Sequence, residues 1–108
     1  MKPIIVYMTW PNKDDALHSG RSLVKKKLVA CCNIKDTVTS IYSWKEEVCE
    51  DTEVTMIAKT TEEKFDSLME YVKKNHEYSV PCILKIPIEG GNPEYLEWLY
   101  SSVSNPSE

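Results

Sequence analysis

The sequence predicts one α+β domain in which strands and helices follow the order β-α-β-β-α-β, with a further helix at the end. Three observations lead to this prediction. Residues 30–44 and 48–60 are rich in Val, Ile, Thr, Cys and Tyr, as strands are, and contain neither proline nor glycine. Segments with the apolar spacing of amphipathic helices lie on both sides of this pair. The length of 108 residues suffices for one hydrophobic core and is short for two.

The first strand and the first helix follow from the opening of the chain. Residues 4–9 are β-branched or aromatic, and Trp10-Pro11 ends the strand because proline lacks the N–H that a ladder needs. Asn12 is a favourable N-cap, since its side chain can accept a hydrogen bond from a first-turn amide. Apolar residues at three- and four-residue spacing then extend the helix to Leu28. The apolar side of this helix is therefore expected to pack against a sheet.

The two long strands that follow predict a β-hairpin around the polar turn Lys45-Glu46-Glu47. Strands usually have about five or six residues, so the far end of this hairpin is expected to extend beyond the domain's own core. Side chains on that overhang would need another surface to bury them. They are Val38, Tyr42, Trp44 and Val54.

The second helix is predicted by a capping signal and a stripe. Thr60 and Glu63 have the spacing of a capping box. The apolar stripe that follows consists of Phe65, Leu68, Met69 and Val72. The segment KKNHEY ends this helix, with Asn75 suited to the left-handed conformation that terminates many helices.

The last strand and the last helix complete the domain. Residues 82–88 predict a strand that begins just after Pro81. Asn92-Pro93 predicts an N-cap followed by proline at the first helical position. We expect a single domain over residues 1–104 and a frayed tail at 105–108.

The predicted order is that of the split βαβ, ferredoxin-like sandwich, in which two helices cover one face of a four-stranded antiparallel sheet. The opposite face receives no cover from these helices. Apolar residues such as Tyr42, Trp44 and Met56 are expected to lie there and to be covered by another subunit.

Charge and hydropathy limit the possible partners. The net charge is −4, and the lysines are dispersed among acidic residues. Nucleic acids and anionic membranes bind concentrated positive charge, so neither is an expected partner. No apolar run approaches the roughly 20 residues of a membrane-spanning helix. The first ten residues do not resemble a signal peptide, so we expect a cytoplasmic location, although a segment removed upstream would leave no trace.

The four cysteines are Cys31, Cys32, Cys49 and Cys82, and none belongs to a CxxC pair. This pattern argues against zinc-knuckle and thioredoxin-type sites and favours reduced thiols. Cys31 and Cys32 are adjacent in a predicted strand, so their side chains should point to opposite faces. Cys31 either packs in a core or interface or contacts a metal. Cys49 and Cys82 are expected to be structural.

Six segments, in this order and at this spacing, together carry a resemblance to a known family. They are TWPNKDDA (9–16), LVACCNI (28–34), SIYSW (40–44), AKTTEEKFD (58–66), NHEYSVPCIL (75–84) and GNPEYLEWL (91–99). Over nearly the whole chain the sequence resembles the CutA divalent-cation tolerance proteins. The resemblance implies a ferredoxin-like fold assembled as a homotrimer, with the long hairpins packed into a shared β core. It also implies a role in tolerance of copper and other divalent metals, with no reaction established for the family.

A metal site is predicted at His76 with Glu77, or at Cys31 under reducing conditions. Imidazole and carboxylate suit Cu(II) or Zn(II), whereas thiolate suits Cu(I). Copper-binding members of the family use cysteines, and Cys31 occupies one such place here. Met8 and Tyr71 occupy two others. We therefore expect weak binding of Cu2+ or another divalent metal ion, and no required cofactor.

His76 has two interpretations. A histidine after a lysine-rich last turn complements the negative end of the helix dipole, so NHEY could be a helix stop only. In relatives the corresponding segment lies beside a cleft between subunits, which leads us to expect that His76 turns into such a cleft. The residues predicted to line it are Tyr42, Trp44, Lys59 and Tyr78, although interface packing would also explain the first two.

The main functional prediction is a trimeric protein that binds copper or another divalent metal ion in metal homeostasis. The sequence contains no Ser-His-acid order, HExxH motif or glycine-rich phosphate loop, so no enzymatic activity is expected. The alternative is a trimeric PII-like signalling or scaffold module. Its inter-subunit clefts would hold a small anionic ligand or a partner's peptide, an analogy of fold alone.

Overall fold

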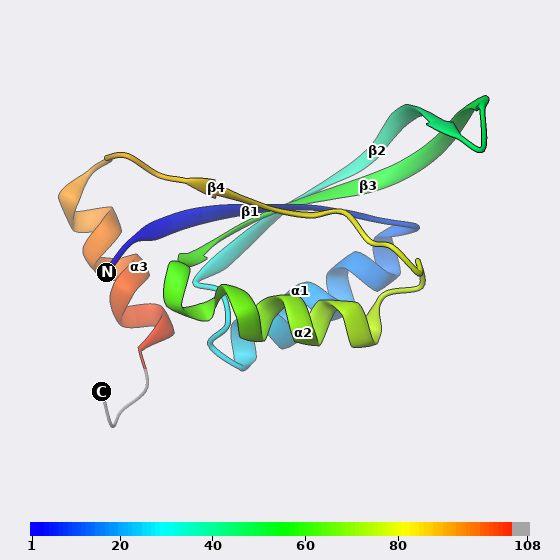
Figure 1. The fold of residues 1–108 in the computed structure, drawn as a ribbon. Coiled ribbons are helices and arrows are strands. Elements are labelled where there is room, and N and C mark those ends of the chain that lie inside the picture. The colour runs from blue at the N-terminus through cyan, green and yellow to red at the C-terminus, as the bar shows by residue number, and fades with distance from the viewer. Residues whose placement is uncertain (105–108) are drawn as a thin grey trace.

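The computed structural model describes residues 1–104, so the predicted tail at 105–108 lies outside the described residues. Residues 1–104 form four strands, three α-helices and one short 3₁₀ turn. The predicted order β-α-β-β-α-β followed by a helix is observed (Figure 1). The elements are β1 (Pro3–Trp10), α1 (Lys13–Lys25), β2 (Cys31–Trp44), β3 (Glu47–Thr61), η1 (Glu62–Lys64), α2 (Phe65–Asn75), β4 (Ile83–Pro87) and α3 (Pro93–Val103).

The strands form one antiparallel sheet in the order β2-β3-β1-β4, which is the order of a split βαβ unit. Helices α1 and α2 lie side by side on one face of it (Figure 1). Helix α3 lies at the end of the sheet where the chain begins, and the β2–β3 hairpin projects from the opposite end (Figure 1). The molecule is therefore elongated, with a longest extent of 48 Å.

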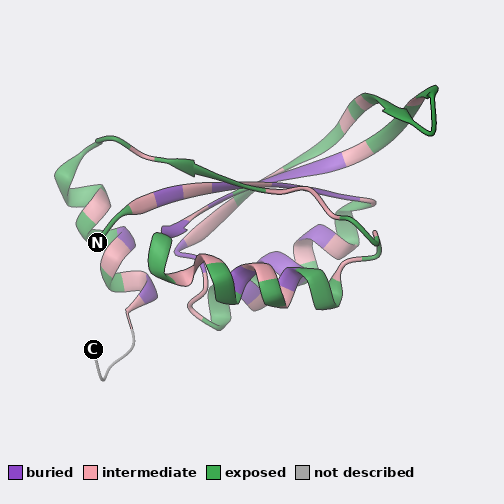
Figure 2. Ribbon diagram, in the orientation of Figure 1, coloured by how far each residue is buried: buried purple, intermediate pink, exposed green. Residues whose placement is uncertain are grey.

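The core lies between the sheet and the two helices. Alternate residues of β1 point towards the helices and are buried, which gives the period-two pattern of a half-covered strand. Burial follows β1, the adjoining part of β3 and the inner sides of the helices, and it ends where the hairpin leaves the domain (Figure 2). The fully buried large side chains include Met8, Trp10, Leu23, Met56 and Leu68.

Two residues predicted to require cover from a partner are instead buried within this chain. Met56 is fully buried and Val54 nearly so, because both point towards the helices from β3. Tyr42 and Trp44 are exposed, as expected, and Val38 is half-buried. The prediction for Met56 and Val54 was wrong because composition alone does not reveal which face of a strand is covered.

Helix α1 approaches the sheet closely at Gly20. A β-carbon on Gly20 would lie 2.9 Å from the Cys32 sulfur, which is closer than such atoms approach in proteins. Cys32 therefore faces the helices, while Cys31 faces the other side of the sheet, as predicted. The helix stops before Leu28 because Lys27 adopts a positive φ of 60°. The Lys27 amide then donates to Val24 O and the Leu28 amide to Leu23 O, which is a Schellman ending.

Helix α2 begins and ends differently from the prediction. Thr60 is not a helix cap, because it lies within β3 and its hydroxyl donates to Leu28 O at 2.8 Å. The 3₁₀ turn η1 follows Thr61 and leads into α2. Asn75 is not left-handed; it is the last helical residue, and its side-chain amide donates to Tyr71 O at 2.8 Å. Both predicted N-caps of the other helices are confirmed, at Asn12 and Asn92.

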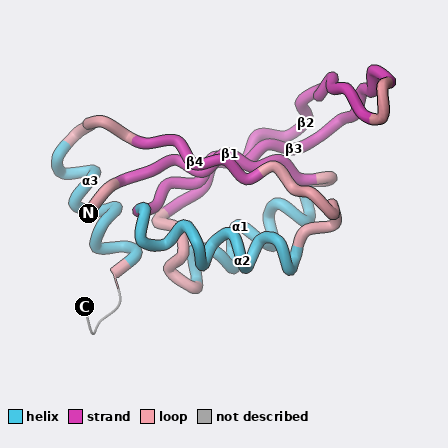
Figure 3. Tube along the Cα trace, in the orientation of Figure 1, coloured by secondary structure: helices cyan, strands magenta, loops and turns pink. Residues whose placement is uncertain are grey.

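The projecting hairpin is shaped by two features that the sequence did not reveal. Its turn has two residues, Lys45 and Glu46, both with positive φ, so Trp44 pairs directly with Glu47. This backbone usually carries Asn-Gly. A β-bulge at Asp36-Thr37 places two residues of β2 opposite Val54 of β3 and shifts the register. The tube view shows the two strands continuing far beyond the helices (Figure 3).

Candidate functional site

The β-bulge at Asp36-Thr37 sets the pairing register of the hairpin, and the register determines which side chains lie on the same face. Residue Lys35 pairs with Thr55 before the bulge, and Val38 pairs with Glu53 after it. Because cross-strand partners point to the same side, Tyr42 and Trp44 lie on the face of Asp51 and Glu53, opposite to the helix-covered face. If the same residues formed an unbroken ladder from Lys35 onwards, Tyr42 would instead pair with Val48 and point to the other side.

These residues line a depression of about 420 Å³ where the hairpin leaves the domain. The loop after α2 forms the opposite wall. We call this depression the aromatic–acidic pocket. It gathers three of the four residues predicted for a ligand cleft, and the sequence analysis missed its carboxylates. The lining residues are Thr9, Tyr42, Trp44, Asp51, Glu53, Tyr78, Ser79, Val80 and Cys82.

Each carboxylate of the pocket accepts a hydrogen bond from a tyrosine. The Tyr42 hydroxyl donates to Asp51, and the Tyr78 hydroxyl donates to Glu53 Oε2 at 2.9 Å. The bond to the Asp51 carboxylate raises the pKa of Tyr42 to about 12. Burial, and then the bond to Glu53, raise the pKa of Tyr78 to about 12. Both phenols therefore remain protonated donors throughout the neutral range.

His76 is held at the edge of this region by three contacts. Its Nδ1 accepts from the Tyr78 amide at 3.0 Å, so Nδ1 carries no proton. Its Nε2 must then donate to the Thr9 carbonyl, 2.7 Å away, because a carbonyl only accepts. The imidazole also stacks on Trp10, with ring centroids 4.3 Å apart. Both ring nitrogens are therefore engaged in hydrogen bonds. These neighbours of His76 are not the ones that we expected, which were Tyr42, Trp44 and Lys59.

A second depression, of about 250 Å³, lies between the start of α1 and the end of α2. We call it the histidine depression. It brings Glu77 and His76 together with two residues that the sequence analysis did not connect to them, Asp15 and His18. Among residues 1–104, no three His, Cys, Asp or Glu side chains are arranged to hold a metal ion as they stand. The lining residues are Asp15, His18, Ser19, Lys74, Asn75, His76 and Glu77.

Cys31 and Lys59 lie at the other end of the sheet. They are cross-strand partners, and the Cys31 sulfur lies 3.5 Å from the Tyr95 hydroxyl of α3. Lys59 lies opposite Ile5 in β1, whereas His76 contacts Thr9. Four residues of strand separate these points, on the order of 13 Å at ~3.3 Å per residue. One subunit therefore does not bring Cys31 to His76, nor Lys59 to the aromatic–acidic pocket.

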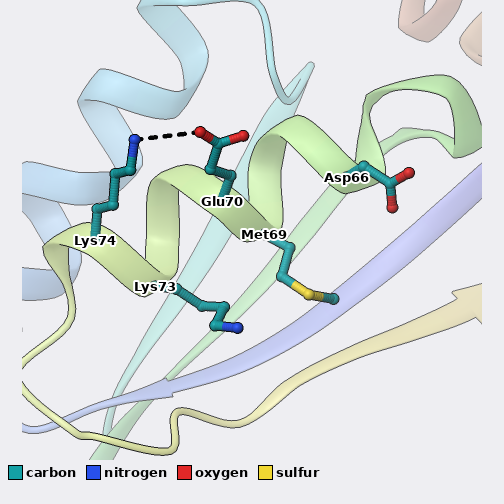
Figure 4. Close-up of a pocket in the computed structure, with 5 residues that line it drawn as sticks. All are labelled: Asp66, Met69, Glu70, Lys73 and Lys74. Atoms are coloured by element: carbon teal, nitrogen blue, oxygen red, sulfur yellow. Dashed lines mark hydrogen bonds and ion pairs between the residues drawn. The ribbon is translucent and has the colours of Figure 1, made fainter.

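A depression on the outer side of α2 offers less chemistry. Figure 4 shows its five lining residues, all from α2: Asp66, Met69, Glu70, Lys73 and Lys74. Lys74 and Glu70 form an exposed pair at 3.2 Å across one helical turn. Such pairs contribute only about 0.3–0.5 kcal/mol and are common on solvated helices. This surface therefore looks like an ordinary helix face.

Comparison with known proteins gives a consistent result. The profile of a family described as "CutA1 divalent ion tolerance protein" matches residues 4–102. "Protein CutA 1, chloroplastic" from Oryza sativa subsp. japonica is 46% identical over 99 residues, covering 92% of this chain and 56% of the rice protein. "Divalent-cation tolerance protein CutA" from Thermus thermophilus is 45% identical over 95 residues, covering 88% of this chain and 92% of that protein.

Solved structures of CutA1 proteins superpose closely on this chain. The crystal structure of CutA1 from Oryza sativa superposes with a TM-score of 0.94 at 44% identity, covering 96% of this chain and 95% of the other. The Thermus thermophilus protein gives 0.92 at 42% identity, covering 94% and 99%. The chain spans only about 56% of the length of its plant relatives. It belongs to the CutA1 divalent ion tolerance family.

Proposed function

We propose that this chain assembles as a homotrimer that binds copper or another divalent metal ion in metal homeostasis. The family's description as a divalent ion tolerance protein carries this proposal. The Thermus relative has the same designation and nearly the same length, so the description refers to the part that this chain covers.

Assembly is supported by apolar side chains that this chain leaves uncovered. Trp44 is 57% exposed and Val48 is 79% exposed on the hairpin. Leu84 and Ile86 are also exposed on the sheet face that the helices do not cover. Exposed apolar side chains of this kind usually mark a subunit interface. Both outer strands of the sheet, β2 and β4, also lack a second strand partner within residues 1–104.

Sedimentation of the purified chain at micromolar concentration tests the assembly. We expect a trimer that Trp44→Ala weakens by about 2–4 kcal/mol, the usual effect of truncating an interface tryptophan. Ser43→Ala, next to it on the other face of β2, is the matched control and should leave the mass unchanged. A folded monomer in the wild type would contradict the proposal.

Metal binding is best supported at the histidine depression. Glu77 is exposed, and His18 is an exposed imidazole without a hydrogen bond among the described residues. Imidazole and carboxylate together suit Cu(II) or Zn(II). These side chains would have to rotate towards one ion, and His76 would have to give up a hydrogen bond to join them. The expected affinity is therefore low.

Calorimetric titration with Cu2+ in thiol-free buffer tests this site. His18→Ala and Glu77→Gln should each weaken binding at least about fivefold, since each removes one of few ligands. Glu63→Gln removes an exposed carboxylate elsewhere and should have no effect. His76→Ala should also reduce binding, but it disturbs the Trp10 stack as well. Cys31→Ser tests the predicted thiolate site under reducing conditions with Cu(I). Heats equal to buffer dilution in the wild type would contradict metal binding.

The alternative of a PII-like module with a small anionic ligand has less support. The pocket that gathers Tyr42, Trp44 and Tyr78 contains two carboxylates, which would repel an anion.

The cytoplasmic location stays a prediction, because relatives carry the words chloroplastic and periplasmic in their names. The absence of enzymatic activity also stays a prediction. No helix among residues 1–104 has the length and apolar character needed to cross a bilayer.

A further inference from the structure

The aromatic–acidic pocket has a charge that nothing in its lining balances. Asp51 and Glu53 lie two residues apart on the same face of β3, and no lysine, arginine or histidine lines the pocket. None of the ion pairs among residues 1–104 involves either carboxylate. Their only side-chain hydrogen bonds in this region come from neutral tyrosine hydroxyls. Within one subunit the pocket therefore has a net negative charge.

The walls of the pocket are aromatic. Trp44 and Tyr42 are 57% and 41% exposed, and Tyr78 reaches them from the loop after α2. The bonds to Asp51 and Glu53 hold the two phenols beside the carboxylates. The face of an aromatic ring attracts a cation within about 6 Å, most strongly in tryptophan. Rings and carboxylates on one concave surface thus favour the same kind of ligand.

We propose that the aromatic–acidic pocket binds a small organic ammonium ion. The volume of about 420 Å³ lies within the usual range for small-molecule sites, roughly 300–1,000 Å³. A divalent metal ion fits less well, because the three rings and Val80 offer no ligand for it. The residues also do not form a metal-holding group of three. An anion would be repelled by both carboxylates.

This inference is independent of the proposed metal site. The aromatic–acidic pocket and the histidine depression share no lining residue. Failure of copper to bind at His18 and Glu77 would leave the ammonium site untouched, and the reverse also holds. Both the pocket and the proposed trimer use Trp44, so one side of the indole must contact a neighbouring subunit while the other side stays open to the pocket. The test therefore uses the assembled protein.

The experiment is an NMR titration of the full chain with choline, followed through the indole N–H of Trp44. The neutral analogue 3,3-dimethylbutanol has nearly the same shape and serves as the control ligand. We expect saturable shifts with choline and shifts at least about fivefold smaller, at equal concentration, with the neutral analogue. Asp51→Asn combined with Glu53→Gln should weaken choline binding about tenfold, since both charges are removed.

The matched control is Glu46→Gln combined with Glu50→Gln. These changes remove the same charge from the same hairpin outside the pocket. They should change choline binding less than twofold. Tyr42→Leu should weaken it about threefold by removing one ring. Equal weakening by the two charge-removing pairs would overturn the proposal, as would equal binding of choline and its neutral analogue. The absence of saturable shifts would also overturn the proposal. So would displacement of choline by Zn2+ together with an affinity for choline that Tyr42→Leu leaves unchanged.

Discussion

The two ends of the long β2–β3 hairpin are built from similar residues but are stabilised by different means. Near the helices, the side chains of β3 point into a closed core, and Met56 and Ala58 are fully buried. At the far end, Ile41 and Val48 are largely exposed although they are equally apolar. The covered end therefore depends on burial within the chain. The projecting end depends on its turn, its cross-strand pairs and, in our proposal, on other subunits.

The largest expected difference between the two ends concerns truncation of an apolar side chain. Met56→Ala should lower the free energy of unfolding by about 3 kcal/mol, because Met56 of β3 is fully buried in the core. Ile41→Ala is the matched change on the projecting end, where the side chain is 64% exposed. It should cost less than about 0.5 kcal/mol in a monomer. Urea unfolding, monitored by circular dichroism, measures both.

A large effect of Ile41→Ala would itself be informative. If its cost depends on protein concentration, another subunit covers Ile41. A large cost at every concentration would contradict the distinction between the two ends.

Relief of the strained hairpin turn should have a smaller effect. Lys45 and Glu46 both have positive φ, which costs non-glycine residues about 1 kcal/mol each. Replacing Lys45-Glu46 by Asn-Gly should therefore stabilise the projecting end by about 1 kcal/mol. Hydrogen exchange at the Ser43 and Val48 amides measures the local gain. An equal gain in global unfolding would show that the projecting end unfolds together with the core.

In the turn between α1 and β2, next to the covered end, Lys27 also has a positive φ. Lys27→Gly should raise the free energy of unfolding by about 0.5–1 kcal/mol, because glycine adopts the required positive φ without a steric penalty. Loss of the Lys27 Nζ contact to Ser104 O, 3.5 Å long, offsets part of this gain. The matched control is Lys26→Gly at a negative φ of −81°, which should destabilise the protein instead. Thermal unfolding of the two variants distinguishes these outcomes.

The smallest effect is expected from pH. The folded pKa values of Tyr42 and Tyr78, about 12, exceed the unfolded value of about 10. Each raised pKa therefore adds stability that is fully present below pH 10 and is lost between about pH 10 and 12. Absorbance of phenolate near 295 nm should show these two tyrosines ionising late. Asp51→Asn should return Tyr42 towards 10, and an unchanged titration would contradict the hydrogen bond.

The sequence was sufficient to predict the fold because its signals are local. The Asn12 and Asn92 caps, the Pro11 stop and the helical stripes each depend on neighbouring residues, and together they define the order of elements. The site was only partly predictable. Tyr42, Trp44 and Tyr78 were identified, but their carboxylate partners depend on register across the hairpin.

The contacts of His76 were also not predictable from the sequence. They join the end of α2 to Thr9 and Trp10, which lie more than sixty residues earlier in the chain. No pattern in KKNHEY specifies these partners. They result from the packing of α2 on the sheet, which brings the end of α2 beside the end of β1.

The bulge at Asp36-Thr37 makes the projecting hairpin tolerant of a change in the number of its residues. Asp36 and Thr37 share one partner, Val54, and the pairs on both sides of them are regular, so deletion of Thr37 would restore an unbroken ladder without changing any later pair. Val38 would still lie opposite Glu53, and Tyr42 would still lie on the face of Asp51. A deletion of this one codon would therefore leave the pocket lining in place. In comparisons among relatives, a gap at this position is not a sign that the pocket has been lost, whereas a loss of its carboxylates or rings would be.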